Sequence, residues 1–260
     1  CLLSAVTLII TLLYFGSLAG VLPAVSILCY ALGLVLLVSI VWIDGMREKA
    51  FAVNVVTPGI VVFILGAIIF WWRFSAATYF FWDEFSHWGL VTKELYFSGV
   101  LDNGSGNAAF PHYPPGTALW HYFVISNTRF SEGAVYLAQF VLLTAPLTVL
   151  YRRVTWRNAW WIIVLFPLQF LLLANFGHGV ASLYADPVIA LLFAATVVSY
   201  LAGTRSAADL LLLAPCLFVL TLVKEIGLLF AAGAALFLLV HQALVVGNIR
   251  ARIPRPRRRR

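Results

Sequence analysis

Long apolar runs that contain no charged residue are the feature that most constrains how this chain can fold. The runs from Val21 to Ile43 and from Val53 to Trp72 hold no Asp, Glu, Lys or Arg. About 20 consecutive apolar residues are enough for a helix to cross the hydrocarbon core of a bilayer. Only 10% of the chain is charged and 63% is hydrophobic, whereas soluble proteins carry roughly 25% charged residues. The sequence therefore predicts an all-α polytopic membrane protein with no sizeable water-soluble domain.

Eight apolar runs predict about eight transmembrane helices within a single transmembrane domain, residues 1–249. The runs are Leu2–Phe15, Val21–Ile43, Val53–Trp72, Ala134–Tyr151, Trp160–Asn175, Pro187–Ala202, Leu210–Val223 and Ile226–Val246. The region from Asp209 to Val246 is too long for one crossing and is interrupted by Lys224-Glu225. Two helices joined by a turn near Gly227 explain this better than one long tilted helix.

Basic residues mark one side of the predicted domain. They follow the second, fourth, sixth and eighth runs, at Arg47, Lys49, Arg152, Arg153, Arg157, Arg205 and in the segment 250–260. Because Lys and Arg are enriched in cytoplasmic connections, we expect this side and both termini to be cytoplasmic, in a cell membrane of the bacterial inner-membrane type. The segment 250–260 reads as a basic cytoplasmic tail rather than a nucleic-acid site, because aromatic residues are not interleaved with its arginines. The start at Cys1 leaves open whether the chain is a piece of a longer protein.

The connection 73–133 is predicted to be an ordered external segment with two helices at the membrane surface. From Asp83 to Tyr96 apolar residues recur with a helical period, and Gly99 can end such a helix. Pro114 and Pro115 stiffen the next turn, and Pro115 suits the first turn of a helix over 117–123. This turn would hold His112 and Tyr113 in fixed positions.

Several carboxylates on the predicted external side have both a structural and a catalytic interpretation. Asp83 and Glu84 could cap the surface helix, or one of them could act as a general base. Neighbouring carboxylates shift each other's proton affinity, which favours the second role. Asp186 precedes Pro187, a natural helix start, so its structural and functional interpretations are about equal.

Cationic residues on the same side are candidates for holding an anionic substrate. Lys224 and Glu225 could neutralise each other, but a charged pair within an apolar region more often marks function. Lys224, Arg73, Lys93 and His112 could each contact a phosphate, and His87 lies on the same stripe as Asp83. The histidines do not form an HxxxH pair, so no metal ligand set is predicted.

The ordered set of motifs resembles the polyprenyl-phosphate-dependent glycosyltransferases of the GT-C superfamily, in particular the protein mannosyltransferase and aminoarabinose transferase types. The matching pieces are Trp82-Asp83-Glu84, Tyr113-Pro114-Pro115-Gly116, Tyr184-Ala185-Asp186-Pro187 and Lys224-Glu225-Ile226-Gly227-Leu228, within residues 53–246. The pattern departs from the family where Tyr113 replaces a basic residue and where two runs precede the helix that normally comes first.

The resemblance implies a GT-C-like fold and an inverting transfer of one sugar from a polyprenyl phosphate to a glycan, lipid or protein acceptor outside the cytoplasm. Asp83 is the first choice for the base and Glu84 the second. Lys224, Arg73, Lys93 and His112 would stabilise the leaving phosphate, and Tyr113 would pack on the sugar or the prenyl chain. The need for a divalent cation is left open. The alternative is a membrane transporter or lipid flippase, since charges at broken helices also mark transport pathways.

Overall fold

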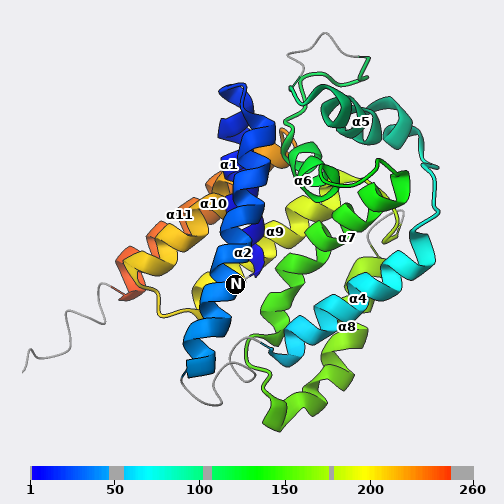
Figure 1. Ribbon diagram of the computed structural model, residues 1–260. Coiled ribbons are helices and arrows are strands. Elements are labelled where there is room, and N and C mark those ends of the chain that lie inside the picture. The colour runs from blue at the N-terminus through cyan, green and yellow to red at the C-terminus, as the bar shows by residue number, and fades with distance from the viewer. Residues whose placement is uncertain (1, 47–55, 102–106, 176–178, 247–260) are drawn as a thin grey trace, which may run out of the picture.

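The computed structural model describes residues 2–46, 56–101, 107–175 and 179–246, which form helices and connections without a strand (Figure 1). Arg47, Lys49 and the segment 250–260 lie outside the described residues. The helices are α1 (Leu2–Leu18), α2 (Leu22–Met46), α4 (Pro58–Phe74), α5 (Gly89–Ser98), α6 (Gly116–Ile125), α7 (Glu132–Leu147), α8 (Ile162–Ala174), α9 (Ala185–Ala202), α10 (Ala207–Val223) and α11 (Gly227–His241). Shorter turns are η1 (Glu84–Trp88) and η4 (Gln242–Val246), which are π-helical, and η2 (Thr148–Tyr151) and η3 (Trp156–Trp161), which are 3₁₀.

Among the described residues, five helical segments are long and apolar enough to cross a membrane. They are Leu22–Trp42, Glu132–Tyr151, Trp156–Ala174, Ala185–Ala202 and Gly227–Leu244. Three shorter apolar helices, Leu2–Leu18, Pro58–Phe74 and Ala208–Val223, coincide with the other predicted runs. The all-helical fold expected from the sequence is thus confirmed, and the length and composition of these helices are compatible with a membrane protein.

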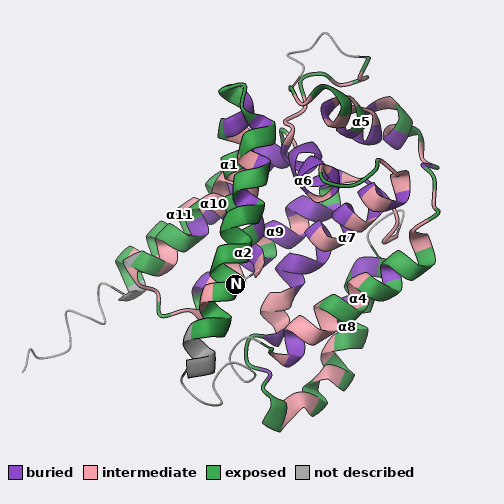
Figure 2. Ribbon diagram, viewed as in Figure 1, coloured by how far each residue is buried: buried purple, intermediate pink, exposed green. Residues whose placement is uncertain are grey.

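The centre of the bundle is made by α7 and α6, and the periphery by α2 and α8 (Figure 2). In the apolar segment that contains α7, 67% of the residues are buried. In each of the segments that contain α2 and α8, 11% of the residues are buried. Helix α6 is buried along almost its whole length, including Leu119, Trp120 and His121. This corrects the expectation of two surface helices, because α6 packs inside a ring formed by α1, α5, α7 and α10. Helix α5 keeps an exposed side that carries Lys93 and Phe97.

The peripheral helix α2 is attached to the core by a few polar contacts near the end of α6. The Tyr30 hydroxyl donates to the carbonyl oxygen of Phe123 at 2.6 Å, and the two rings stack with centroids 4.3 Å apart. The hydroxyls of Ser26 and Ser126 lie 3.1 Å apart. The Phe123 carbonyl belongs to the last turn of α6, whose carbonyls lack backbone donors within the helix, and the Ser126 hydroxyl also donates to it, at 3.1 Å.

Helices α9 and α10 span the bundle and define its two ends. Helix α9 carries Asp186 in its first turn and Ser199 in its last, and α10 has Asp209 in its first turn and is followed by Lys224. Lys224 contacts Asp186, whereas Arg152 donates to the Ser199 carbonyl. The end with Asp186 and Lys224 is called the α5–α6 end, after the helices that lie over it in Figure 1. The other is called the arginine end, after Arg152, Arg153, Arg157 and Arg205.

The predicted break between the last two apolar runs is confirmed. Helix α10 ends at Val223, Lys224 is extended, and α11 begins at Gly227. A Cβ on residue 227 would overlap the carbonyl oxygen of Leu220. The turn therefore requires glycine, and it places Lys224 at the α5–α6 end rather than midway along a helix.

Candidate functional site

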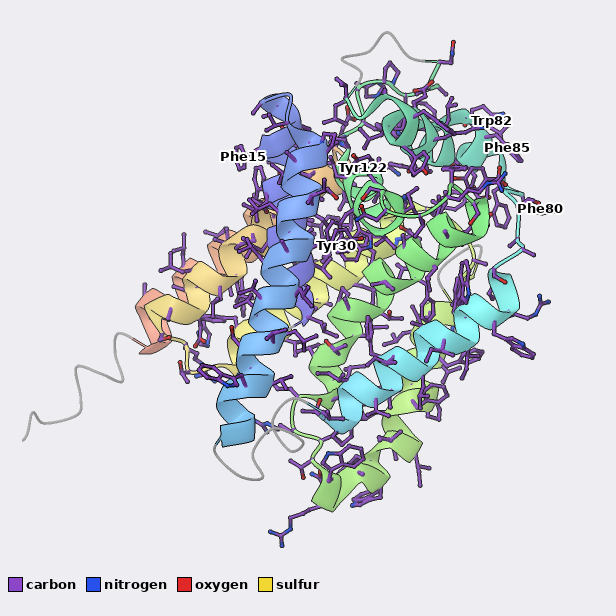
Figure 3. The ribbon with its side chains drawn as sticks, viewed as in Figure 1. Phe15, Tyr30, Phe80, Trp82, Phe85 and Tyr122 are labelled. Atoms are coloured by element: carbon purple, nitrogen blue, oxygen red, sulfur yellow. The ribbon has the colours of Figure 1, made fainter. Side chains whose placement is uncertain are left out.

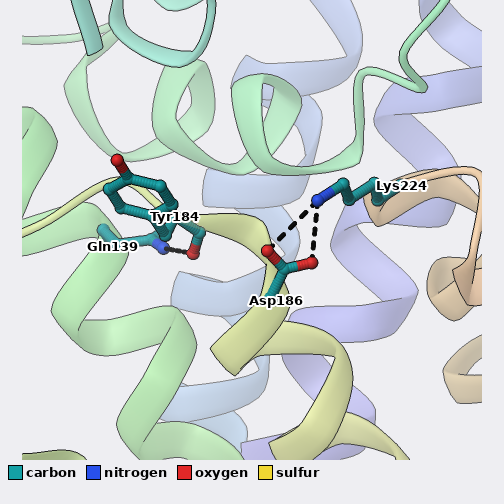
Figure 4. A network of polar contacts seen from close by, with 4 residues as sticks. All are labelled: Gln139, Tyr184, Asp186 and Lys224. Atoms are coloured by element: carbon teal, nitrogen blue, oxygen red, sulfur yellow. Dashed lines mark hydrogen bonds and ion pairs between the residues drawn. The ribbon is translucent and has the colours of Figure 1, made fainter. Parts of the chain in front are cut away.

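An ion pair between α9 and the α10–α11 turn forms the best-defined part of the α5–α6 end. Lys224 Nζ donates to both carboxylate oxygens of Asp186, at 2.8 and 3.1 Å (Figure 4). The Asp186 side chain is 60% exposed and that of Lys224 is 25% exposed. Because an ammonium has three N–H donors, one donor of Lys224 is left over for a further acceptor. The two residues matched by the resemblance thus meet, although they are far apart in sequence.

Tyr113 connects this ion pair to the surface segment that follows α4. Its ring lies 5.8 Å from Lys224 Nζ and is stacked on Trp88 and Phe110, with centroids 5.5 and 5.0 Å away. A cation at this distance from an aromatic face is attracted to the ring quadrupole. The Tyr-Pro-Pro turn therefore places the ring of Tyr113 next to a cation.

Gly116 explains why the Tyr-Pro-Pro turn comes so close to Lys224. A Cβ on residue 116 would lie 2.5 Å from the carbonyl oxygen of Leu222, in the last turn of α10. Only glycine permits this approach of the first turn of α6 to the end of α10. Tyr113 lies three residues before Gly116, and Lys224 lies two residues after Leu222. The close approach of Gly116 to Leu222 therefore brings the Tyr113 ring near the Lys224 ammonium.

Asp83 reaches the same region through Tyr184. Asp83 is half-buried and lies just before the π-helical turn η1. Burial, the charges of Asp83 and Glu84, and a hydrogen bond to Asp83 all raise the pKa of Tyr184. Tyr184 lies two residues before Asp186, and Figure 4 shows its ring on the side of this segment away from Lys224. Asp83 and Lys224 therefore flank the segment 184–186 from opposite sides.

Glu84 has a structural position, which corrects the expectation that it could serve as the second choice of base. It is fully buried. One carboxylate oxygen accepts from the amides of Phe80 and Phe81 and from the Tyr136 hydroxyl, at 2.9, 3.0 and 2.6 Å, and the other accepts from the Leu183 amide at 3.0 Å. A carboxylate that already holds four donors and has no exposed surface cannot take a proton from an acceptor. Glu84 instead fixes the segment before η1 against α7 and against the start of α9.

His87 lies beside Asp83 but is not placed as a phosphate-binding cation. It is 3% exposed and packs edge-on against Tyr113, with centroids 5.1 Å apart. Burial lowers its pKa, the charge of Asp83 opposes this and His112 adds to it, and the resulting pKa is about 4. The ring is therefore neutral near pH 7, and its Nδ1 has no hydrogen-bond partner among the described residues.

Three other predicted cations are at the surface. His112 lies 3.7 Å from Glu225, and both side chains are more than half exposed. This contact brings His112 to the α10–α11 turn. Arg73 is exposed at the end of α4, where its guanidinium lies 5.2 Å from the ring of Phe74, and Lys93 is exposed on α5. The structure thus joins His112 to the cluster by a direct contact, and Arg73 and Lys93 remain peripheral.

A buried polar chain behind the site was not identified from sequence. A neutral His121 ring with its proton on Nε2 donates to Gln139 Oε1 at 2.9 Å and accepts from Thr92 at Nδ1, at 3.0 Å. Gln139 in turn donates to the carbonyl oxygen of Tyr184 at 3.0 Å (Figure 4). Burial keeps His121 neutral by lowering its pKa to about 4. The signal was Gln139 itself, a polar residue within an apolar run, which is costly unless it has partners.

Exposed aromatic residues surround Asp83 on the outside of the bundle. Phe80, Trp82 and Phe85 are 81%, 65% and 56% exposed, and Figure 3 shows them together beside α5. Aromatic residues of this kind are enriched where a membrane protein meets the headgroup region. They make the surroundings of Asp83 apolar on one side.

Within the described residues, no group of three or more His, Cys, Asp or Glu side chains is arranged to hold a metal ion. Comparisons with protein-family models, with curated proteins and with solved structures found no match to this chain.

Proposed function

We propose that this chain is a membrane glycosyltransferase that moves a sugar from a polyprenyl phosphate to an acceptor hydroxyl outside the cytoplasm. The observation that carries the proposal is the meeting of Asp186, Lys224, His112 and Tyr113 at the α5–α6 end, with Asp83 bonded to the same segment through Tyr184. We further propose that eight helices cross the membrane in a GT-C-like arrangement. The arginine end then faces the cytoplasm, in agreement with the positive-inside rule.

In this proposal Asp83 is the general base. The acceptor oxygen attacks the anomeric carbon of the sugar while its proton passes to the Asp83 carboxylate. The bond between the anomeric carbon and the phosphate oxygen breaks, and polyprenyl phosphate leaves with the electron pair. A direct displacement of this kind inverts the anomeric configuration. The half-buried position of Asp83 beside a tyrosine hydroxyl supports a carboxylate that is accessible yet partly desolvated.

Lys224 is the proposed partner of the leaving phosphate. Charge that develops on the phosphate is stabilised by a cation already fixed in position, because no reorganisation is then needed during the reaction. Asp186 provides this fixation by holding two donors of the ammonium. His112 is exposed next to the same turn and can contact a second phosphate oxygen.

The aromatic surroundings suit a donor whose other half is a hydrocarbon chain. The exposed Phe80, Trp82 and Phe85 offer a surface for isoprenoid units. The ring of Tyr113 lies beside Lys224, where it can contact the sugar. Both contacts agree with a donor presented from the membrane rather than from water.

The test is sugar transfer by the purified chain reconstituted in vesicles with radiolabelled polyprenyl-phosphate sugars and a membrane extract as the source of acceptor. We expect label in a new covalent product and free polyprenyl phosphate, with Asp83→Asn lowering the rate by roughly 10²–10⁴-fold. Translocation of intact donor across the vesicle without a product would favour the flippase alternative. Transfer at the normal rate by Asp83→Asn would contradict the assignment of the base.

A further inference from the structure

The arginine end contains a cavity of about 560 Å³ that plays no part in the proposed function. It lies between the beginnings of α1, α4 and α10, with η2 beside it. Its walls are mostly apolar, and Leu2, Ala5, Ile60 and Leu213 are representative. The volume falls in the range of roughly 300–1,000 Å³ that is usual for small-molecule sites.

Polar groups are concentrated on one side of this cavity, around η2. Arg152 and Ser199 line it, and the guanidinium donates to the Ser199 carbonyl oxygen at 3.2 Å. Tyr151 also lines it and is 4% exposed, yet its hydroxyl has no hydrogen-bond partner among the described residues. The Ser199 hydroxyl is also buried and has no hydrogen-bond partner among the described residues. The accessible polar group on this side of the cavity is therefore the guanidinium of Arg152, which is exposed.

The feature of the cavity that favours an anion is the guanidinium of Arg152. The carboxylate within the cavity is that of Asp209, and this group is occupied in capping α10, where it accepts from the Thr204 hydroxyl at 2.6 Å and the Ser206 amide at 3.2 Å. Arg152 has no carboxylate within salt-bridge distance in the part of the chain that the structure describes. Exposed Arg153 and Arg157 follow it directly. The beginnings of three 17-residue helices add the positive end of their dipoles.

The apolar part of the cavity continues onto the outer surface of the bundle. Leu212 lines it and is 61% exposed, and its neighbour Leu211 is 75% exposed. A ligand that combines an anionic head with a hydrocarbon tail would place the head at Arg152 and the tail along α10. Basic pockets between transmembrane helices on the cytoplasmic side bind anionic lipid headgroups in this way.

We infer that this cavity binds an anionic phospholipid, with the phosphate at Arg152 and one acyl chain against α1 and α10. The inference does not depend on the glycosyltransferase proposal, because the cavity and the α5–α6 end are at opposite ends of α9 and α10. Its occupant would hold α1, α4 and α10 together at their beginnings. The expected effect is therefore on binding and stability, with no change in the chemistry at Asp83.

The test is isothermal titration of the full chain in detergent with dioctanoyl phosphatidylglycerol, dioctanoyl phosphatidylcholine and inorganic phosphate. We expect one saturable site for phosphatidylglycerol, with phosphatidylcholine binding at least tenfold more weakly and phosphate alone not at all. Arg152→Ala should weaken phosphatidylglycerol binding about tenfold, as expected for loss of a hydrogen bond to a charged group. Arg153→Ala, which removes an exposed neighbouring charge that does not line the cavity, is the matched control and should leave the affinity unchanged.

A second pair of variants tests the place of the acyl chain. Ala5→Trp fills the cavity and should abolish saturable binding, whereas Leu8→Trp changes an exposed residue of the same helix outside the cavity and should not. If Ala5→Trp fails to fold, Ile60→Trp on the opposite wall replaces it. Equal binding of the two lipids, or an unchanged affinity in Arg152→Ala, would overturn the inference. Equally tight binding of inorganic phosphate would show that the cavity binds a free anion, which would overturn the assignment of a phospholipid.

Discussion

Lys224 and Asp186 are held together by two hydrogen bonds, from Nζ to Oδ1 at 2.8 Å and to Oδ2 at 3.1 Å, so the α10–α11 turn is tied to the first turn of α9. The pair is exposed on the side of Asp186, and water screens much of its attraction. Exposed ion pairs contribute about 0–1 kcal/mol to stability. The pair therefore contributes little to folding, and the ammonium of Lys224 is available for the binding role proposed above.

The first prediction concerns this ion pair. Lys224→Met should lower sugar transfer by about 10²–10³-fold, because it removes the positioned charge for the leaving phosphate. The melting temperature of the purified protein should change little. Lys224→Arg is the control that keeps the charge, and it should retain more activity than Lys224→Met. A large loss of stability with normal transfer by the remaining folded protein would show that the pair is structural.

The second prediction separates two adjacent carboxylates. Glu84→Gln should destabilise the protein by about 1–3 kcal/mol, because an amide cannot accept from all four donors that the buried carboxylate holds. Asp83→Asn should leave stability almost unchanged and remove transfer. Thermal unfolding in detergent and the transfer assay, measured on both variants, check this opposite pattern. The reverse pattern would mean that the two roles are exchanged.

The third prediction concerns the close approach of α6 to α10. Gly116→Ala should cost on the order of 1–3 kcal/mol and should reduce transfer, because the added methyl group pushes the Tyr-Pro-Pro turn away from Leu222. Gly66→Ala is the matched control, since a Cβ there meets Phe140 at an ordinary 3.7 Å. Equal melting temperatures for the two variants would contradict the proposed packing.

The fourth prediction is a dependence of stability on pH through His87. Its pKa is about 4 in the folded protein, below the ordinary value of 6.5. Between pH 6.5 and pH 4 the imidazole of His87 is protonated in the unfolded chain but neutral in the folded protein. The folded protein is therefore destabilised as the pH falls from 6.5 to 4. His87→Phe keeps an aromatic ring and should flatten this part of the curve of melting temperature against pH. His121, whose pKa is also about 4, contributes in the same direction and should keep a residual slope in that variant.

The arrangement of helices followed from features that act locally. Apolar runs identified the helices, and Gly99 and Gly227 marked two of their boundaries, since the first has a left-handed φ of 67° and the second allows a tight turn. Pro115 preceded α6 as expected. The meeting of Lys224 and Asp186 was predicted from alternation of the runs, because each crossing returns the chain to one of only two ends.

The features that could not be predicted depend on neighbours that are distant in sequence. Trp120 and Tyr122 suit a surface helix at a membrane as well as a buried one, and only the ring of helices around α6 decides between them. The π-helical turn η1 turns Glu84 inward while Asp83 remains half-buried. The two neighbouring acids both carry a carboxyl group, and the hydrogen bond from the Tyr136 hydroxyl on α7 to Glu84 distinguishes them.

The polar attachment of α2 has a consequence for how this helix can move. Most of its surface is free of protein contacts, and the side that faces the bundle packs on α1 and carries the hydrogen bonds of Tyr30 and of the pair of Ser26 and Ser126. Inside hydrocarbon there is no water to replace a broken hydrogen bond. A lateral departure of α2 would leave the Tyr30 hydroxyl without its acceptor and the Phe123 carbonyl with the Ser126 hydroxyl alone, so this bond opposes movement of α2 away from α6.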